Sequence, residues 1–396
     1  MVVFSKRQEG FAVRKKLIGT RVLACAALAT LLTGALTACL AAPPDTSKIV
    51  KVSSVTSAGY VWDYYRNTAY PCSVSGYQTF VIGRKVGSSD TASKPLWAYM
   101  HGGGVGSFSS AGVPLPNANN MDEESRTTLL SYLTGPGLVS KVRASGYRIL
   151  GVSMCSHDAY GGMNTADPHN PNRTPGGQLR PTTGLIATKS AIAFAKAEYP
   201  SDDVFLHGTS AGSVGTYHVA WSLQLQGDPP TGVVADASIL NQEQFQASYA
   251  QSVCTTAAEY GVKAGLLARI HPEVADPDNQ PDRLVSRGEL TVPLMHVWNK
   301  GDTNTCSDTT MSCPVNGGTV TLGSTTCIHR PMTLAIAALG SASRSRNLPL
   351  CVEGTSSIAC DKHVVTMIDG TNTLVGSPAD YNQAIWDWVQ LRRADD

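Results

Sequence analysis

The segment Gly208-Thr209-Ser210-Ala211-Gly212 constrains the fold of this chain more than any other feature. It fits the pattern G-x-S-x-G, follows the apolar run 204–206, and precedes a stretch at 214–226 with helical spacing. A serine that projects from a very tight turn between a strand and a helix needs small neighbours, because larger side chains would collide with the turn. The sequence therefore predicts a strand–turn–helix unit with Ser210 at its tip as a candidate nucleophile. The alternative is a turn with a structural role only.

The segments around this unit alternate between strand-like and helix-like patterns. Such an alternation is typical of α/β domains, in which helices cover both faces of a mostly parallel central sheet. Two stretches, 240–290 and 303–347, fit the alternation poorly, and we expect lid-type insertions there within one domain of residues 61–396. The predicted strands are 78–84, 95–101, 147–154, 203–207, 231–235 and 292–298, and the predicted helices are 123–133, 184–199, 214–226 and 380–393.

A glycine-rich segment, His101-Gly102-Gly103-Gly104, ends one of the predicted strands. Acyl transfer passes through a tetrahedral oxyanion, and backbone N–H groups held at its position supply a large part of the rate. Glycines let the backbone approach closely and aim these groups. We expect the N–H groups of Gly103, Gly104 and Ala211 to form an oxyanion hole, the alternative being a flexible surface turn.

The candidate base is a histidine that follows the serine in the chain. In domains with this serine turn, the chain order is serine, acid, histidine. His363 lies between an apolar stretch at 348–352 and the predicted terminal helix, which is where the base belongs. His329 and His271 remain alternatives, and any of the three could be a surface or packing histidine.

The candidate acid lies at the end of the predicted strand 292–298. Asp302 follows this strand in the exit Asn299-Lys300-Gly301-Asp302. A carboxylate there could hold the imidazole tautomer and stabilise the imidazolium ion. Asp236, at the end of another predicted strand, is the competing candidate and is otherwise expected to cap a helix.

The first 39 residues have the pattern of an export signal. A basic start is followed by an uncharged apolar run at 22–36 and by Leu36-Thr37-Ala38-Cys39. This ending resembles the lipobox of bacterial lipoproteins, which implies lipidation of Cys39 and possible membrane attachment, although ordinary signal cleavage nearby would leave the same sequence. We therefore expect an exported protein, either a periplasmic or outer-surface lipoprotein or a secreted one. Residues 40–60 are expected to be a tether.

Charge disfavours a nucleic-acid partner, and the cysteine content agrees with export. The net charge falls from +1 for the whole chain to about −4 without the first 39 residues, and the absence of a long basic stripe makes nucleic acid an unexpected partner. Eight cysteines follow the leader, an even number typical of disulfides formed in an oxidising compartment. We expect Cys351 to pair with Cys360, and Cys306 with Cys313 or Cys327.

Together these segments resemble the α/β-hydrolase superfamily over roughly residues 78–393. Within it, the layout is most similar to the pectin acetylesterases and the related Notum carboxylesterases. The segments that carry the likeness are Gly102–Gly104, Met154–Asp158, Gly208–Gly212, Val234–Ala237 and Cys360-Asp361-Lys362-His363. The resemblance implies an α/β-hydrolase fold and ester hydrolysis, and the subfamily likeness implies deacetylation of a polysaccharide.

The chain also departs from these families. Val105 stands where the pectin acetylesterases have Trp, and Cys155-Ser156-His157 replaces their Cys-Asp-Gly. Hormone-sensitive-lipase-like enzymes share the His-Gly-Gly-Gly segment but have Gly-Gly where this chain has Gly212-Ser213.

The expected function is a serine carboxylic-ester hydrolase with Ser210, His363 and Asp302 as its triad. It needs no metal or organic cofactor, and it would act on small-molecule or polymer esters, including acetyl or other short acyl esters. The same triad could serve an amidase, a peptidase or a polyester or lipid hydrolase. A different reading is a non-catalytic surface lipoprotein that binds a glycan or a partner.

Overall fold

The computed structural model describes residues 39–115, 121–238, 266–302, 304, 310–315, 318–340, 342–351, 360, 362–368 and 381–393. The expected export signal, apart from Cys39, and residues 240–265 of the first expected insertion lie outside these ranges.

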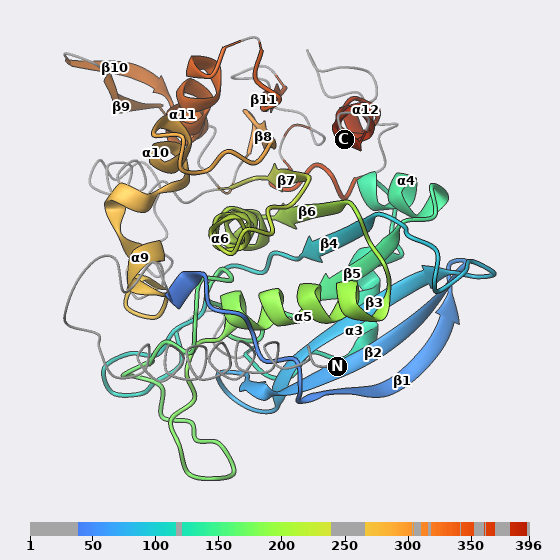
Figure 1. The fold of residues 1–396 in the computed structure, drawn as a ribbon. Coiled ribbons are helices and arrows are strands. Elements are labelled where there is room, and N and C mark those ends of the chain that lie inside the picture. Colours follow the sequence, from blue (N-terminus) through green and yellow to red (C-terminus); the bar gives the residue numbers. More distant parts are fainter. Residues whose placement is uncertain are drawn as a thin grey trace, which may run out of the picture.

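The described residues contain a nine-stranded mixed sheet with the order β1-β2-β3-β5-β4-β6-β7-β8-β11 (Figure 1). The first three strands pair antiparallel, and β3 also pairs antiparallel with β5. From β5 to β11 all neighbours are parallel. The strands are β1 (Ile49–Ser57), β2 (Tyr60–Pro71), β3 (Tyr77–Lys85), β4 (Leu96–Met100), β5 (Arg148–Val152), β6 (Val204–Thr209), β7 (Gly232–Asp236), β8 (Leu294–Asn299) and β11 (Arg346–Leu350).

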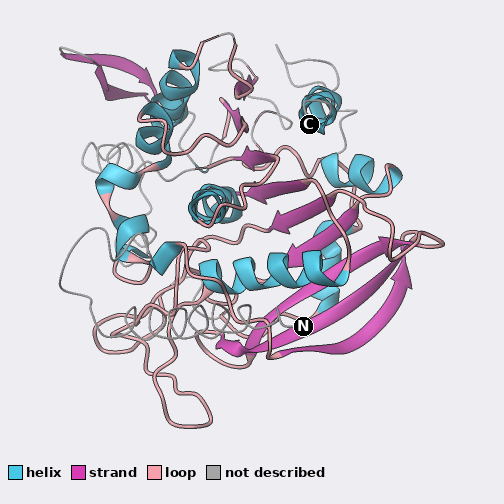
Figure 2. Cartoon of the chain, viewed as in Figure 1, coloured by secondary structure: helices cyan, strands magenta, loops and turns pink. Residues whose placement is uncertain are grey.

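Strands β4, β5, β6, β7 and β8 are buried along their whole length, because helices cover both faces of the sheet (Figure 2). One core lies under α5, α6 and α11, and a second core lies under α3, α4 and α12. Shorter helical pieces, α9, η2 and α10, precede β8. The helices are α3 (Arg126–Leu133), α4 (Leu138–Ala144), α5 (Gly184–Glu198), α6 (Ala211–Leu225), α9 (Pro272–Ala275), η2 (Pro277–Asn279), α10 (Pro281–Ser286), α11 (Ser324–Ala338) and α12 (Tyr381–Arg393).

The position of β4 creates a switch point in the sheet. The chain passes from β4 to β5 on one side of it and then to β6 on the other. Ligands of open α/β sheets bind at the carboxyl ends of strands where the order reverses in this way. His101-Gly102-Gly103-Gly104 and Ser210 follow β4 and β6, so both lie at this point.

The predicted fold class is confirmed. The chain has an α/β fold of the α/β-hydrolase type, with a mostly parallel sheet, helices on both faces and a strand–turn–helix unit at Ser210. Each strand and helix predicted from the alternation is present, with its ends shifted by at most three residues. Within the second expected insertion, β9 (Thr310–Val315) and β10 (Gly318–Gly323) form a separate hairpin, whereas α11 packs on the main sheet as a crossover helix.

The expected tether at 40–60 is wrong for the described structure. Ile49–Ser57 is strand β1, paired along its length with β2. Leu40 is fully buried, and its carbonyl oxygen accepts hydrogen bonds from Lys189 Nζ at 2.5 Å and Ser222 Oγ at 2.6 Å. Ser and Thr alternate with apolar residues in this stretch, which is the pattern of an edge strand as well as of a linker.

The described disulfides confirm one predicted pair and correct another. Cys351 pairs with Cys360, but Cys313 pairs with Cys327, so neither is available to Cys306. Cys72 pairs with Cys155 and joins the end of β2 to the loop after β5. Cys39 is also disulfide-bonded. A sulfur in that state carries no thioether, so attachment of a lipid to Cys39 would require the disulfide to be absent.

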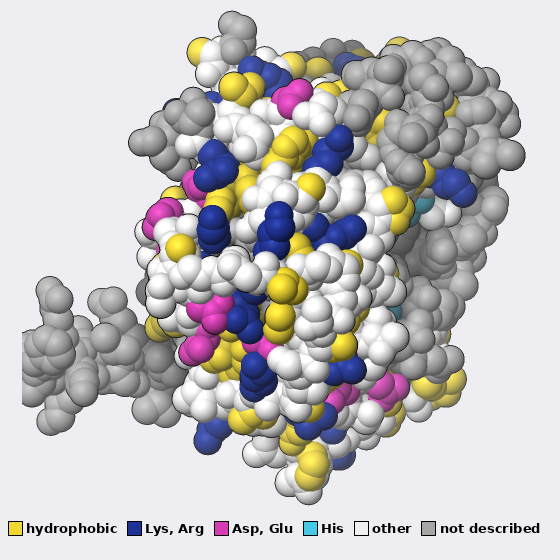
Figure 3. Space-filling model, turned by 90° about the vertical axis from the view of Figure 1, so that its right-hand side faces the viewer, with side chains coloured by type: hydrophobic (Ala, Val, Ile, Leu, Met, Phe, Trp, Pro, Cys, Tyr) yellow, Lys and Arg dark blue, Asp and Glu magenta, His cyan; other side chains and the backbone are white. Residues whose placement is uncertain are grey.

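The outer surface carries charges of both signs. Figure 3 shows one face on which Lys and Arg side chains are scattered among Asp, Glu and apolar side chains. Some of these charges form ion pairs, such as Arg84 with Asp90 and Arg393 with Asp203. In the described ranges, no helix is long and apolar enough to cross a membrane.

Candidate active site

Ser210 lies at the tip of the turn between β6 and α6. Its backbone has φ 53° and ψ −123°, a region that a non-glycine residue rarely adopts and that occurs at functional sites. Its N–H donates to the Asp236 carbonyl oxygen at 2.9 Å. A side chain at Gly208 would overlap the Gly212 backbone, and one at Gly212 would overlap the Met100 carbonyl. Both glycines of the motif are therefore required by the tightness of this turn.

The side chain of His363 joins Ser210 to Asp302. His363 Nε2 lies 2.9 Å from Ser210 Oγ, and His363 Nδ1 lies 2.7 Å from Asp302 Oδ2. An ionised carboxylate can only accept, so Nδ1 carries the hydrogen in the neutral ring and Nε2 has a lone pair for the serine hydroxyl. Asp302 is buried, whereas the His363 side chain is 14% exposed. The structure thus brings the three predicted triad residues together in the order that nucleophilic catalysis needs.

Contacts between the two loops that carry Asp302 and His363 set this geometry. Asn299 Nδ2 donates to the carbonyl oxygens of Cys360 at 2.6 Å and Lys362 at 2.8 Å. A side chain at Gly301 would overlap the Cys360 carbonyl, so the loops touch through their backbones. The Cys351–Cys360 disulfide ties the loop that carries His363, called the base loop below, to the end of β11.

Asp236, the competing acid, does not contact His363 Nδ1. Its Oδ2 accepts from the backbone N–H groups of Val365 at 2.9 Å and Thr366 at 2.7 Å, and from Thr366 Oγ1. Burial raises the pKa of Asp236 to about 6, although the hydrogen bonds from Thr366 and Val365 and the charge of His363 act in the opposite direction. Asp236 is therefore an anchor for the base loop, and not the helix cap that was the other expectation.

The glycine loop, residues 102–104, lies against the serine. A side chain at Gly102 would approach Ser210 Cβ to 2.7 Å and the Thr209 carbonyl to 2.8 Å. Gly103 and Gly104 have φ of 142° and 75°, which favour glycine. In the part of the chain that the structure describes, the N–H groups of Gly103 and Gly104 have no acceptor. These donors, with the N–H of Ala211 at the start of α6, are available beside Ser210.

The structure places His329 and His271 away from Ser210 Oγ. His329 is buried in α11, where Nδ1 lies 3.1 Å from His296 Nε2 and the ring stacks on Trp298. His296 in turn forms a hydrogen bond with Tyr217. His329, His296 and Tyr217 line a recess whose volume, with its open mouth counted, is about 280 Å³. His271 precedes α9 and accepts from the Glu273 N–H. Burial lowers the pKa of His271 to about 4.

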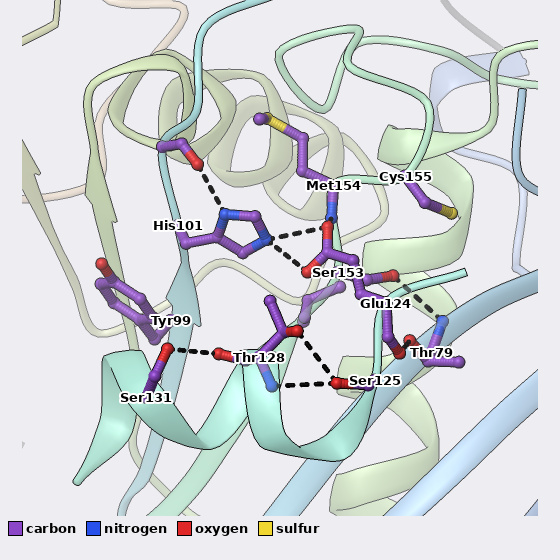
Figure 4. A network of polar contacts seen from close by, with 12 residues as sticks. Thr79, Tyr99, His101, Glu124, Ser125, Thr128, Ser131, Ser153, Met154 and Cys155 are labelled. Carbon is purple, nitrogen blue, oxygen red and sulfur yellow. Dashed lines mark hydrogen bonds and ion pairs between the residues drawn. The ribbon is translucent and has the colours of Figure 1, made fainter. Parts of the chain in front are cut away.

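The sequence analysis missed Glu124. Its carboxylate contacts His101, whose ring in turn contacts the glycine loop (Figure 4). His101 Nε2 lies 2.9 Å from Glu124 Oε2, and the two side chains are 6% and 10% exposed. Glu124 follows Glu123 at the start of the predicted helix 123–133 and looks like a solvent-facing residue of its first turn. Only its proximity to His101 in the fold could have indicated a role.

No metal centre is seen in the described ranges, where no three His, Cys, Asp or Glu side chains converge as metal ligands would. The polar groups beside Ser210 are instead hydrogen-bond donors and one base. This arrangement can deprotonate a hydroxyl and stabilise a developing negative charge on oxygen.

Comparisons with known proteins found structural likeness only. No protein-family model matches the chain, and no curated protein matches it. The chain is similar to a fungal esterase from Rhizomucor miehei, with 11% identity, a TM-score of 0.44 and coverage of 96% of this chain and 97% of the other. It is also similar to the rice cell wall degrading esterase LipA from Xanthomonas oryzae (10% identity, TM-score 0.41, 80% and 92% covered). Carboxyl esterase 2 from Tuber melanosporum is similar too, with 12% identity, a TM-score of 0.42, and 87% and 90% covered.

Proposed function

We propose that this chain is a serine carboxylic-ester hydrolase with Ser210 as nucleophile, His363 as base and Asp302 as orienting acid. The observation that carries this proposal is the continuous hydrogen-bond chain from Ser210 Oγ through His363 to Asp302. The strained turn at Ser210 and the open donors of the glycine loop support it. Acetyl or other short acyl esters of small alcohols or polymers are the substrates that we propose.

The first half-reaction forms an acyl-enzyme. His363 Nε2 takes the proton of Ser210 Oγ as Oγ attacks the ester carbonyl carbon. The negative charge on the carbonyl oxygen is stabilised by the N–H groups of Gly103, Gly104 and Ala211. When the tetrahedral intermediate collapses, the ester C–O bond breaks and the alcohol leaves with the proton from His363. Asp302 stabilises the imidazolium ion in between.

The second half-reaction releases the acid. A water molecule gives a proton to His363 Nε2 and attacks the acyl carbon, and the same donors bind the new oxyanion. The bond to Ser210 Oγ then breaks, and Oγ takes the proton back from His363. One water is consumed for each ester cleaved, and no other reactant is needed.

A pair of matched substrates tests the reaction class. The purified chain should hydrolyse p-nitrophenyl acetate, and a serine-directed fluorophosphonate should label the peptide that contains Ser210. The corresponding anilide, p-nitroacetanilide, should react far more slowly. Preferred hydrolysis of the anilide would favour the amidase alternative, and an unlabelled Ser210 in an inactive protein would favour a binding role.

We further propose that the chain acts outside the cytoplasm. The three described disulfides and the oxidised Cys39 are typical of proteins that fold in an oxidising compartment. Membrane attachment needs a thioether at Cys39 in place of its disulfide. The intact mass of the exported protein, before and after reduction, distinguishes a lipid adduct from a disulfide.

A further inference from the structure

Beyond the triad, one buried ion pair lies directly behind the glycine loop. Glu124 Oε1 and Oε2 lie 3.1 and 2.9 Å from His101 Nε2, while His101 Nδ1 lies 2.6 Å from the Gly102 carbonyl oxygen. Figure 4 shows the His101 ring directed at the Glu124 carboxylate. The triad mechanism described above uses neither side chain.

The hydrogen-bond partners of His101 and Glu124 determine which of their atoms carry protons. The Gly102 carbonyl can only accept, so His101 Nδ1 carries a hydrogen. Glu124 Oε1 accepts the Met154 N–H at 2.9 Å, which favours the carboxylate form. One proton then lies between His101 Nε2 and Glu124. Hence the pair is an imidazolium with a carboxylate, both held in a buried site where such bonds are strong.

Hydrogen bonds to its backbone hold Glu124 in place. Its backbone carbonyl accepts from Tyr64 Oη at 2.7 Å and Thr79 Oγ1 at 2.9 Å, and these residues belong to β2 and β3. The His101 ring also stacks on Tyr132 of α3, with ring centroids 4.5 Å apart and planes 6° apart. These contacts therefore fix the position of the Gly102 carbonyl relative to the sheet.

The Gly102 carbonyl controls the direction of a proposed oxyanion donor. In a trans peptide, the carbonyl of one residue and the N–H of the next point in opposite directions across one plane. The bond from His101 to the Gly102 carbonyl therefore fixes the direction of the Gly103 N–H. Glycine has no side chain that could fix the direction of this N–H, and the backbone of Gly103 can adopt many conformations.

We propose that Glu124 and His101 are a positioning pair that fixes the Gly103 N–H in the oxyanion hole. This inference rests on the proposed ester hydrolysis. Neither residue touches the substrate, and both act through the Gly102–Gly103 peptide. Loss of the pair therefore lowers stabilisation of the transition state and leaves ground-state binding of the ester nearly unchanged.

The charge of the pair gives a second signature. Burial of His101 opposes its charge, but the Glu124 carboxylate and the Gly102 carbonyl outweigh burial and raise the pKa of His101 above its ordinary value of 6.5. The other titratable side chains around the pair are His157, which acts on Glu124, and the phenols of Tyr99, Tyr132 and Tyr160, whose pKa values are raised and which stay neutral. As the pH rises through the His101 pKa, the neutral ring presents a lone pair to the carboxylate. The positioning effect is then lost on the alkaline side.

The experiment compares wild type, His101→Phe and Glu124→Gln with p-nitrophenyl acetate. Phenylalanine keeps the stack on Tyr132 but removes both hydrogen bonds. We expect kcat to fall at least about tenfold, against 10² to 10³ for complete loss of one oxyanion donor, with KM within about twofold. Asp63→Asn is the matched control, because it breaks the two ion pairs of a buried carboxylate, with Lys51 and Arg84, far from the glycine loop, and should leave kcat unchanged.

Glutamine at 124 can accept from Met154 and donate to a neutral His101, so it keeps the geometry without the charge. We expect it to retain most of the activity at pH 7 and to lack the alkaline fall in kcat that we expect of wild type as the pH rises through the raised pKa of His101. A folded His101→Phe protein with wild-type kcat would overturn the proposal. The same alkaline profile in wild type and Glu124→Gln would overturn it as well, even if His101→Phe did not fold. An inactive wild type would instead contradict the proposed function and not the pair alone.

Discussion

Asp236 binds Thr366 through two hydrogen bonds to one carboxylate oxygen. Oδ2 accepts the Thr366 backbone N–H and its Oγ1 hydroxyl, each at 2.7 Å. Thr366 lies three residues after His363, and Asp236 lies at the end of β7, whose backbone also binds the Ser210 N–H. One aspartate at the end of a strand therefore links the serine turn to the base loop.

Because Asp236 anchors the loop and Asp302 contacts the imidazole, the two aspartates should behave differently. We predict that Asp302→Asn lowers kcat by about 10³ to 10⁴ with little change in KM, since the ring then loses the partner that selects its tautomer. Asp236→Asn should have a much smaller effect on kcat. Steady-state kinetics of both variants checks this. A larger loss of kcat in Asp236→Asn than in Asp302→Asn would indicate that Asp236, and not Asp302, orients the imidazole.

Asp236 should also make stability depend on pH. Its pKa rises from 3.8 to about 6 in the folded chain, so the folded state binds the proton more tightly than the unfolded state. Its contribution is therefore greatest below pH 3.8 and is lost as the pH rises through about 6. The loss is about 3 kcal/mol, at about 1.4 kcal/mol per pKa unit.

The measurement is the difference in free energy of unfolding between wild type and Asp236→Asn, taken from urea titrations across this pH range. Other groups that titrate, such as Glu124, cancel in that difference. A difference that is constant with pH would contradict the raised pKa of Asp236.

The second glycine of the serine turn should tolerate no side chain. In Gly212→Ala the added Cβ overlaps the Met100 backbone, which cannot move without displacing β4. We predict that the variant is destabilised by about 1–3 kcal/mol, as overpacked cores are, and that its kcat collapses because Ser210 moves. Gly135→Ala is the control, since its Cβ would meet its nearest atom at 3.7 Å. Equal kcat in the two variants would be inconsistent with the turn described.

The disulfide next to the base should affect both stability and rate. Removal of the nine-residue link between Cys351 and Cys360, by Ser at both positions, should cost about 2–3 kcal/mol and lower kcat, because Cys360 holds the loop of His363. Ser at Cys313 and Cys327 should cost similar stability with a smaller effect on kcat. Thermal unfolding and kinetics of the two double variants check the contrast. Unchanged kcat without the Cys351–Cys360 bond would remove its proposed role.

Local patterns in the sequence were sufficient for the serine turn and the parallel strands. Gly208 and Gly212 have steric roles that follow from the turn itself, and buried parallel strands are continuous apolar runs. His363 and Asp302 could be selected by chain order, because the order of strands in this fold decides which loops reach the serine.

Other features depend on contacts that no local pattern encodes. Glu124 acquires its role by meeting His101, and Asp236 by meeting a loop 130 residues away. The partner of Cys313 is set by how β9 packs on α11. The partner of Cys72 is set by the approach of the chain ends that follow β2 and β5, two strands with β3 between them. The sequence of β1 predicts a tether, because an edge strand with Ser, Thr and Lys on its exposed face has the composition of a linker.

The most direct test of the central claim is hydrolysis of p-nitrophenyl esters from C2 to C12 by the chain without the proposed export signal and by its Ser210→Ala variant. We predict that wild type is active, with the highest kcat/KM on the shortest acyl groups, and that the variant loses at least about 10³-fold in kcat while it unfolds at the same urea concentration. A variant as active as wild type would show that Ser210 is not the nucleophile.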